Sequence, residues 1–231
     1  MTTGEAVSPA PARSTQQERS AAGSWLHPGC PADLTDCSTL LIRMLRLDAV
    51  GLVRLQQVGE NVSLWAQPLG VVVRREIRAR MTVGDRTVSA AELLTAVTAD
   101  TAGAVALPAP RDEAWRVTLP PRSGWSVLDS VPVQVIRDLA DSAGRVVRAA
   151  TDPVGAGESL LDQETLRVSQ GADVVVVPLR VVAVLNRMGF VGAEGHSADV
   201  VRVACTPAWT RLAARHGTVY QRRGGLRLGL A

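Results

Sequence analysis

The chain has 231 residues, of which 46% are apolar and 20% charged, with 25 basic side chains against 22 acidic ones. This balance excludes disorder throughout and predicts one domain or two small ones around a sizeable core. Every basic residue is Arg and none is Lys, which excludes a Walker A loop, a protein kinase site and a pyridoxal phosphate Schiff base. Residues with AT-rich codons are scarce, so a GC-rich genome accounts for most of the Arg content.

The N-terminal residues predict a tail. Residues 1–24 contain prolines and many small polar residues but no apolar h-region, so we expect a disordered tail over residues 1–28 and no signal peptide. The most apolar stretch, Val174–Leu185, is broken by Pro178 and is too short to span a bilayer. Three cysteines in a chain of this length argue against a disulfide framework. We therefore expect a cytoplasmic protein with no membrane partner.

Residues 29–105 predict a first lobe of helices and hairpins. Leu34–Leu47 carries apolar residues at the spacing of one helix face. Two strands, Val50–Val58 and Val62–Ala66, are separated by a short turn of the kind that joins antiparallel neighbours. The segment Val71–Val83 alternates between apolar and charged residues, which predicts a strand with one buried and one solvated face.

A second helix and a linker follow in this lobe. After a turn at residues 83–87, Ser89 and Glu92 have the spacing of a capping box at the start of a helix. Residues 101–111 hold two prolines among Ala and Gly and predict a linker or long loop. The chain then forms either two lobes hinged here, with residues 111–231 as the second, or one continuous domain.

The second lobe mixes strands and helices without regular alternation. It opens with an extended segment, Trp115–Pro121, and a helix capped by Asp129 or Ser130 with Pro132 in its first turn. The later expected elements are a hairpin of Thr165–Ser169 and Asp173–Val177 with its valines buried on both faces, a helix Leu179–Met188 ended by Gly189, a strand Val200–Cys205, a helix Ala208–His216 and a strand Thr218–Arg222. No internal repeat is evident. This order predicts an α+β fold of antiparallel hairpins with packed helices.

One group of residues has the types that bind zinc. His27, Cys30 and Cys37 are spaced H-x2-C-x6-C. A structural zinc site needs a fourth ligand and usually paired C-x2-C knuckles, and Cys37 lies on the apolar stripe of the first predicted helix. We expect no metal and no cofactor, and keep these three residues only as candidates.

No catalytic residue stands out. A G-x-S-x-G elbow is missing, and His196 and His216 fit a surface loop and a helix end better than a catalytic base. Pairs of carboxylates along the chain are no more frequent than chance allows. We therefore expect a protein that is not an enzyme, although an enzyme of an unrecognised class stays open.

The Arg residues suggest a surface that contacts phosphates. Arg74, Arg78 and Arg80 share the solvated face of one predicted strand, and the chain after Asp199 contains Arg but no acid. Candidate nucleic-acid contacts are Arg74, Arg78, Arg80, Arg211, Arg215, Arg222 and Arg223. The net charge is only +3 and no known nucleic-acid-binding motif accompanies them, so a solvated basic face is the alternative.

The five Trp residues outnumber the other aromatic residues and predict packing anchors, with Trp115 and Trp125 holding the extended prolines between them. A peptide-binding groove is the other interpretation. Several short motifs between residues 50 and 223 stand out. They are Leu64-Trp65-Ala66, Trp115 with Leu119-Pro120-Pro121, Val177-Pro178-Leu179, Arg187-Met188-Gly189-Phe190-Val191-Gly192, and Trp209 with Leu212-Ala213 and Gly217-Thr218-Val219-Tyr220. Together they resemble an uncharacterised family of hypothetical proteins from actinobacteria. The resemblance implies a cytosolic bacterial protein and assigns no activity.

Three functions are consistent with these observations. The first is a non-catalytic cytosolic protein that acts by binding a macromolecular partner, in the first instance a protein. The second is an accessory protein that binds nucleic acid through Arg, and the third is an enzyme of an unrecognised class.

Overall fold

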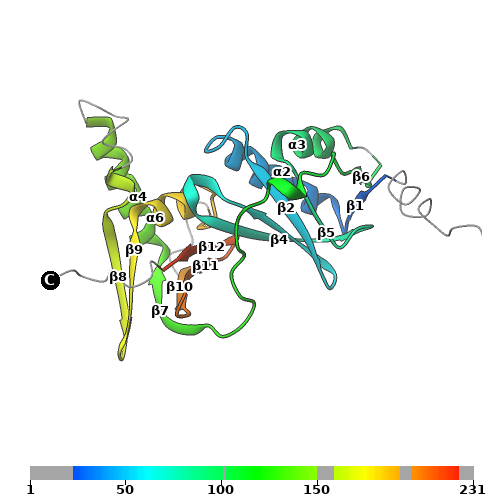
Figure 1. The fold of residues 1–231 in the computed structure, drawn as a ribbon. Coiled ribbons are helices and arrows are strands. Elements are labelled where there is room, and N and C mark those ends of the chain that lie inside the picture. The colour runs from blue at the N-terminus through cyan, green and yellow to red at the C-terminus, as the bar shows by residue number, and fades with distance from the viewer. Residues whose placement is uncertain (1–22, 101, 150–158, 193–198, 224–231) are drawn as a thin grey trace, which may run out of the picture.

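A computed structural model describes residues 23–100, 102–149, 159–192 and 199–223 (Figure 1). Its helices and antiparallel strands confirm the α+β fold. The N-terminal half contains β1 (Trp25–Pro28), α2 (Pro31–Leu45), β2 (Leu52–Val58), β3 (Asn61–Ala66), β4 (Val72–Met81), β5 (Asp85–Ser89), α3 (Ala90–Ala99) and β6 (Val105–Ala106). The C-terminal half contains β7 (Ser126–Pro132), α4 (Val133–Ala149), β8 (Glu164–Gln170), β9 (Asp173–Pro178), α6 (Leu179–Arg187), β10 (Val200–Cys205), β11 (Trp209–Ala214) and β12 (Gly217–Arg222).

One long antiparallel sheet runs through both halves. Its strand order is β5-β2-β3-β4-β12-β11-β10-β7, and β1 and β6 attach beside β4. The halves meet where β4 pairs with β12, with Thr218 opposite Arg74 and Tyr220 opposite Val72. The hairpin β8–β9 forms a separate two-stranded sheet.

The helices cover one face of the long sheet (Figure 1). Helix α2 packs against α3 in the N-terminal half, and α4 packs against α6 in the C-terminal half. A single cluster of buried apolar residues lies beneath them and includes Leu40, Leu64, Leu185 and Leu212, all fully buried. Arg43 of α2 also donates to the carbonyl of Met188, 2.8 Å away, and so ties the two halves together on the helix side.

The other face of the sheet, here called the open face, carries a small cluster of its own. Residues 107–125, here called the connector, run from β6 across this face to β7 (Figure 1). Trp65, Val72, Trp209 and Tyr220 from the sheet are buried there, and four connector residues pack on them: Trp115, Val117, Leu119 and Trp125. The connector therefore gives the open face a second, aromatic core.

Two indole hydrogen bonds hold the connector in its extended form. Trp115 Nε1 donates to the carbonyl of Val117 at 2.8 Å, and Trp125 Nε1 donates to the carbonyl of Pro121 at 3.0 Å. Both tryptophans thus fix the segment that contains Pro120 and Pro121, as predicted. Trp25 differs from the other indoles because it is 39% exposed.

Most elements lie where the hydrophobic pattern places them, including α2, β2, β3, β4 and the β8–β9 hairpin. Helix α3 begins after Ser89, whose side chain accepts from the N–H of Glu92 as the capping box predicts. Gly189 follows α6 with φ of 67°, a left-handed conformation that suits the residue after a helix.

Two predictions about the N-terminal half were wrong. Residues 25–28, expected within the tail, form β1, which pairs with β4 and β6; residues 1–22 lie outside the described residues. Residues 85–87, expected within a turn at residues 83–87, belong to β5, which forms the edge of the sheet beside β2. The segment expected as a linker or long loop, residues 101–111, includes the two-residue strand β6, which pairs with β1, and leads into the connector.

Three further predictions were wrong in the C-terminal half. Asp129 and Ser130, expected as helix caps, lie in β7, and α4 begins only at Val133. The β9 valines are not buried on both faces, since Val174 is 39% exposed. The helix expected at residues 208–216 is β11, whose backbone pairs with β10 and β12. In the described part of the chain, no helix has both the length and the apolar character needed to cross a membrane.

Candidate functional site

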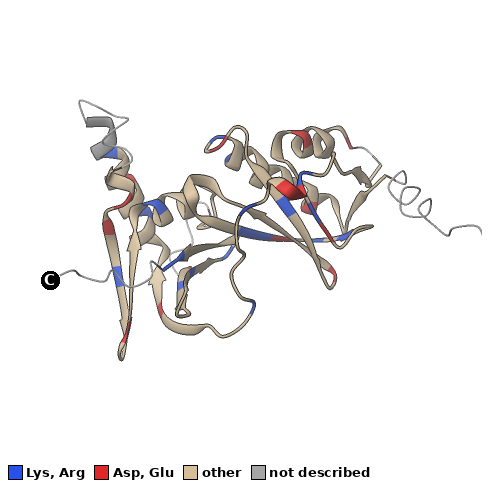
Figure 2. Ribbon diagram, viewed as in Figure 1, with Lys and Arg blue, Asp and Glu red and all other residues tan. Residues whose placement is uncertain are grey.

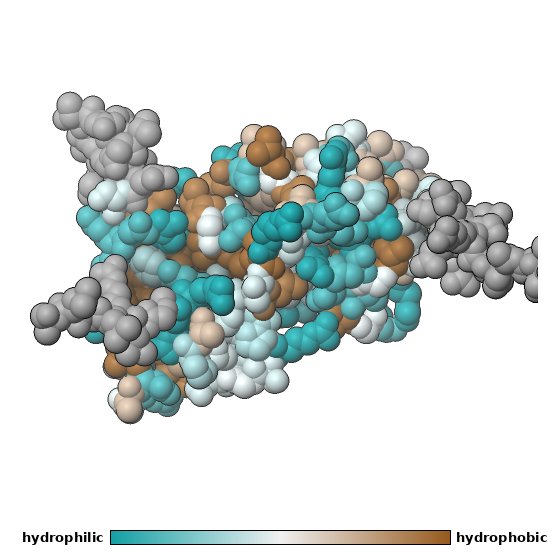
Figure 3. Space-filling model, in the orientation of Figure 1, coloured by the Kyte–Doolittle hydropathy of each residue, from teal (hydrophilic) through white to brown (hydrophobic). Residues whose placement is uncertain are grey.

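The candidate site is a pocket on the open face, where the connector crosses the junction of the two halves. Its volume is about 370 Å³. The sheet supplies its floor and the connector its wall; the lining residues are Gln56, Val58, Ser63, Trp65, Arg74, Leu119, Pro120, Pro121, Arg122, Trp125, Arg211 and Tyr220. In Figure 3, apolar residues are visible between hydrophilic ones over the middle of the molecule. The pocket needs both halves and the connector, so neither half contains it alone.

Strand register places Arg74 in this pocket. Arg74 lies opposite Trp65 of β3 and opposite Thr218 of β12, so it stands at the junction of the halves. Its guanidinium carbon lies 5.4 Å from the centroid of the Trp65 ring and 6.0 Å from that of Tyr220. The Arg74 Nη1 atom is also 3.5 Å from an oxygen of Glu76, an ion pair in which both side chains are partly exposed. Cation–π contacts of this kind hold an Arg in place without neutralising its charge.

Arg211 approaches the same Tyr220 ring from β11. It lies opposite Tyr220, and its guanidinium carbon is 4.6 Å from the centroid of the Trp125 ring. Its Nε is buried and has no hydrogen-bond partner among the described residues. Burial lowers the pKa of Arg211, and the positive charges of Arg74 and Arg202 lower it further against the opposing effect of Tyr220. The surroundings of Arg211 therefore provide too little negative charge to balance its guanidinium.

The aromatic side chains between the two arginines are themselves buried. The Tyr220 ring lies 5.7 Å from Trp65 and 5.8 Å from Trp125, measured between centroids. Burial raises the pKa of Tyr220, although Arg74 and Arg211 partly offset this, so the phenol stays protonated at neutral pH. Trp65 Nε1 is buried and has no acceptor among the described residues. Buried polar atoms normally have a hydrogen-bond partner. The unsatisfied N–H groups of Trp65 and Arg211 therefore distinguish this site.

The charge of the lining distinguishes this pocket from two other hollows. It contains Arg74, Arg122 and Arg211 and, among the described residues, no carboxylate, His or Cys. A second hollow includes Asp36 and Glu76 beside its arginines, and a third includes Glu60 beside Arg78 and Arg80. A lining without carboxylate, His or Cys offers no metal ligands and few groups for acid–base catalysis. It is suited to binding an anionic or aromatic group.

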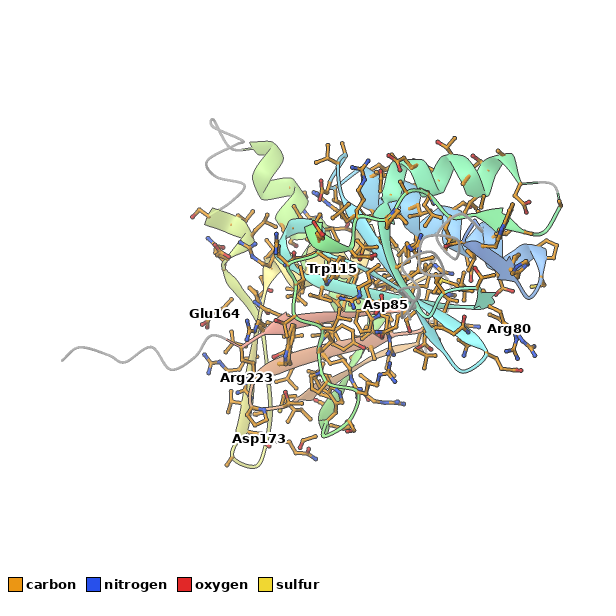
Figure 4. The ribbon with its side chains drawn as sticks, turned by 45° about the vertical axis from the view of Figure 1, so that its right-hand side comes forward. Arg80, Asp85, Trp115, Glu164, Asp173 and Arg223 are labelled. Carbon is orange, nitrogen blue, oxygen red and sulfur yellow. The ribbon has the colours of Figure 1, made fainter. Side chains whose placement is uncertain are left out.

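Of the seven candidate Arg residues, Arg74 and Arg211 line this pocket and the other five do not. Figure 2 shows basic residues along β4, and Figure 4 places Arg80 and Arg223 at opposite ends of the sheet. Arg78 and Arg80 pair with Glu60 at 3.6 Å and 3.0 Å, and Arg215 pairs with Asp199 at 3.6 Å. The seven residues therefore do not form one continuous basic surface.

The two C-terminal candidates have local roles. The guanidinium of Arg222 lies 5.8 Å from the ring centroid of Trp209 on the open face. Arg223 donates to the carbonyls of Thr206 and Val174, at 3.2 Å and 2.9 Å, and so links β12 to the β8–β9 hairpin.

The zinc candidates do not form a site. In the described residues, no group of three His, Cys, Asp or Glu side chains could hold a metal ion. Cys37 is fully buried in α2, and burial raises the pKa of its thiol to about 12; the thiolate that zinc requires is therefore not formed at neutral pH. The thiol of exposed Cys30 lies 3.1 Å from Asp33 at the start of the same helix. His196 lies outside the described residues.

Sequence reasoning missed Trp65, Trp125, Tyr220 and Arg122 as site residues. It interpreted the tryptophans as packing anchors, which Trp65 and Trp125 also are. The one usable signal was the Trp- and Pro-rich connector, because an extended segment with two indoles must lie against some surface. The surface that the connector covers depends on the pairing of β4 with β12. No local sequence pattern indicates this pairing.

Two family models match the chain, and they meet within the connector. Residues 22–117 match a domain of unknown function (DUF8010), and residues 120–226 match a second one (DUF8185). The pocket takes its lining from both matched regions. No curated protein matches the chain significantly.

The fold is similar to that of bacterial sliding clamps. The beta chain of DNA polymerase III from Streptococcus pneumoniae has a TM-score of 0.56 at 10% identity, covering 89% of this chain and 66% of that one. The sliding clamp of Caulobacter crescentus has 0.57 at 16%, covering 90% and 67%, and that of Bartonella birtlesii, solved with griselimycin, has 0.57 at 12%, covering 89% and 66%. The chain thus spans about two thirds of the length of these proteins. At sequence identities of 10–16%, the similarity shows a shared fold.

Proposed function

We propose that the chain is a non-catalytic cytoplasmic accessory protein that binds a protein partner, and that the open-face pocket receives part of this partner. The observation that carries the proposal is the lining of the pocket: three Arg and three aromatic residues, with no carboxylate, His or Cys among its described residues. Trp, Tyr and Arg are the residue types that contribute most to protein–protein binding energy. The similarity to sliding clamps, subunits of DNA polymerase III, supports an accessory role over a catalytic one.

Crosslinking from the pocket tests this proposal. Arg122, exposed at the connector, would be replaced by a photoreactive amino acid in cells that produce the protein, and crosslinked proteins identified by mass spectrometry. The same label at Arg167, exposed on the β8–β9 hairpin, is the matched control. We expect a crosslink specific to position 122 that disappears when Arg74→Glu and Arg211→Glu are added. A crosslink that these substitutions leave unchanged, or none at position 122, would refute the pocket as the binding site.

Nucleic acid is the second candidate partner, because the open face carries Arg74, Arg202, Arg211 and Arg222 on neighbouring strands. Binding through phosphates is strongly salt-dependent. Fluorescence anisotropy of labelled double- and single-stranded DNA would be measured over a salt series with the wild type and with Arg202→Glu. A lack of binding at low ionic strength would eliminate this candidate and leave the first unaffected.

A further inference from the structure

The charges around the open-face pocket are unbalanced. Arg211 forms no ion pair within the described residues, and none of its N–H groups has an acceptor there. Among the described residues, the one acid that pairs with Arg74 is Glu76, at 3.5 Å. A partly buried guanidinium without hydrogen bonds is costly, and a carboxylate bound by such a group forms stronger hydrogen bonds than a neutral acceptor does.

Both guanidinium groups lie beside the same aromatic cluster, that of Arg74 near Trp65 and Tyr220 and that of Arg211 over Trp125. Arg74 is 6.0 Å from the centroid of Tyr220, and Arg211 lies directly opposite Tyr220 in the neighbouring strand. All three residues line the pocket together with Arg122. Two cations that line one small pocket match one compact anion. A nucleic-acid backbone, in contrast, needs a line of cations at successive phosphates, and Arg78 and Arg80, which would extend the cations of the open face along β4, are already paired with Glu60.

The wall that the connector supplies is largely apolar and extended. Leu119, Pro120 and Pro121 form one wall, and Trp125 is held beside them by its bond to the Pro121 carbonyl. A rigid wall of this kind favours an apolar side chain without a large cost in ordering the pocket. The volume of about 370 Å³ accommodates a few side chains rather than a folded element.

From these observations we infer that the pocket binds a short peptide segment of the partner in which an acidic residue is flanked by apolar residues. The carboxylate lies between Arg74 and Arg211, and the apolar neighbour packs on Leu119, Pro121 and Trp125. This inference rests on the proposed function, since it specifies the chemistry of the partner at the same site.

The test uses the tripeptide acetyl-Leu-Glu-Leu-amide and its neutral counterpart acetyl-Leu-Gln-Leu-amide. Binding would be followed by the indole N–H resonances of the five Trp residues in nitrogen-15-labelled full-length protein. We expect the Glu peptide to shift the resonances of Trp65 and Trp125, to leave that of Trp25 in place, and to bind at least about tenfold more tightly than the Gln peptide.

Matched variants assign the effect to the two arginines. Arg211→Gln and Arg74→Gln should each weaken binding of the Glu peptide by roughly tenfold or more, whereas Arg80→Gln, exposed on the same strand as Arg74, should not change it. An unchanged spectrum of the variants without peptide shows that they remain folded.

Three outcomes would overturn the inference. They are equal binding of the Glu and Gln peptides, equal shifts on addition of inorganic phosphate, which would indicate a general anion site, and no shift of Trp65 or Trp125 with either peptide. The Arg122 crosslink distinguishes these failures from failure of the proposed function. A partner crosslinked there without carboxylate selectivity leaves the proposed function standing and removes only the acidic peptide.

Discussion

The two halves of the long sheet have the same arrangement of strands, but their outer edge strands, β5 and β7, differ in how they are covered. In each half a three-stranded meander, β2-β3-β4 or β10-β11-β12, is extended by a fourth strand, β5 or β7, and backed by a pair of helices. The last strands of the two meanders, β4 and β12, pair with each other. At the outer edges the halves differ. The connector covers β5, where Arg111 N–H donates to the Thr87 carbonyl at 2.7 Å, whereas β7 leaves Val127 48% exposed.

This difference shows which parts of the sheet can vary while the shared strand arrangement is kept. The shared arrangement requires only apolar residues on the helix side, and both halves contribute these to a single core. Charged and aromatic residues on the open face are not needed for that core, and they differ between the halves. The pocket depends on this freedom, because Arg74 comes from the N-terminal half, Arg211 from the C-terminal half and Arg122 from the connector.

The largest expected effect tests whether the halves share one core. Leu64 in β3 and Leu212 in β11 are both fully buried in the common cluster. Leu64→Ala and Leu212→Ala should each lower the free energy of unfolding by about 2–5 kcal/mol, and both should shift a single transition in urea. Val127→Ala, at an exposed position, is the control and should have little effect. Two transitions, with each variant moving only one, would mean that the halves unfold independently.

A second prediction compares one ion pair from each half. Arg75 is nearly buried and lies 2.6 Å from Asp36, whereas Arg215 is exposed and lies 3.6 Å from Asp199. Asp36→Asn should cost about 1–3 kcal/mol in urea unfolding, because it leaves the Arg75 charge without its partner. Asp199→Asn should cost about 0–1 kcal/mol. Equal losses would show that burial does not distinguish the two pairs.

The covered edge of β5 gives a third prediction. An oxygen of Asp112 accepts from the N–H of Thr87 at 2.5 Å, so the connector is bound to the edge strand. Asp112→Ala should cost about 1–2 kcal/mol and should speed hydrogen exchange of the Thr87 amide. Asp112→Asn keeps a side-chain oxygen and serves as the matched control. If exchange at Thr87 is as slow in Asp112→Ala as in the wild type, the connector does not protect this edge.

The smallest expected effect is a pH dependence at the junction of the halves. Burial lowers the pKa of His216, and the charges of Arg75 and Arg215 add to this while Asp36 and Asp199 oppose it. A lowered pKa means that the folded state binds the proton less readily than the unfolded chain. Stability should therefore be highest above the ordinary His pKa of about 6.5 and should decline as the pH falls through the lowered value.

The variant His216→Gln isolates this effect. Urea unfolding of both proteins over a pH series should show that the wild type loses more stability than the variant as the pH falls below neutrality. Parallel curves for the two proteins would show that His216 does not contribute.

Much of the fold could be predicted from local patterns. The helix α2 and the strands β2, β3 and β4 each have one buried face, so their periodicity is visible in the sequence. The prediction failed at β11, where Trp209 packs under the connector while Leu212 packs in the main core. A strand covered on both faces loses the alternation that identifies it, and Trp209, Leu212 and Ala213 then have the spacing of a helix.

The candidate site could be predicted only in part. Arg74 was expected on a solvated strand face, which is correct, and Arg211 was one of several basic residues near the C-terminus. Nothing in the sequence indicated that these two residues lie around Tyr220, because they are more than a hundred positions apart. Of the other five candidates, Arg222 lies beside Trp209 on the same face but outside the pocket, and the remaining four have acids or carbonyls as partners.

The sequence by itself determined the α+β class, the α2–β4 elements of the N-terminal half and the exclusion of Lys-dependent chemistry, because these follow from composition and from periods of a few residues. Only the tertiary structure decided that the two halves repeat one plan, that β4 pairs with β12, and that the connector crosses the opposite face from the helices. Apolar alternation marks which side of a strand is buried but not which strand lies beside it. The pocket, which exists only where these long-range choices meet, therefore could not be deduced before the fold was known.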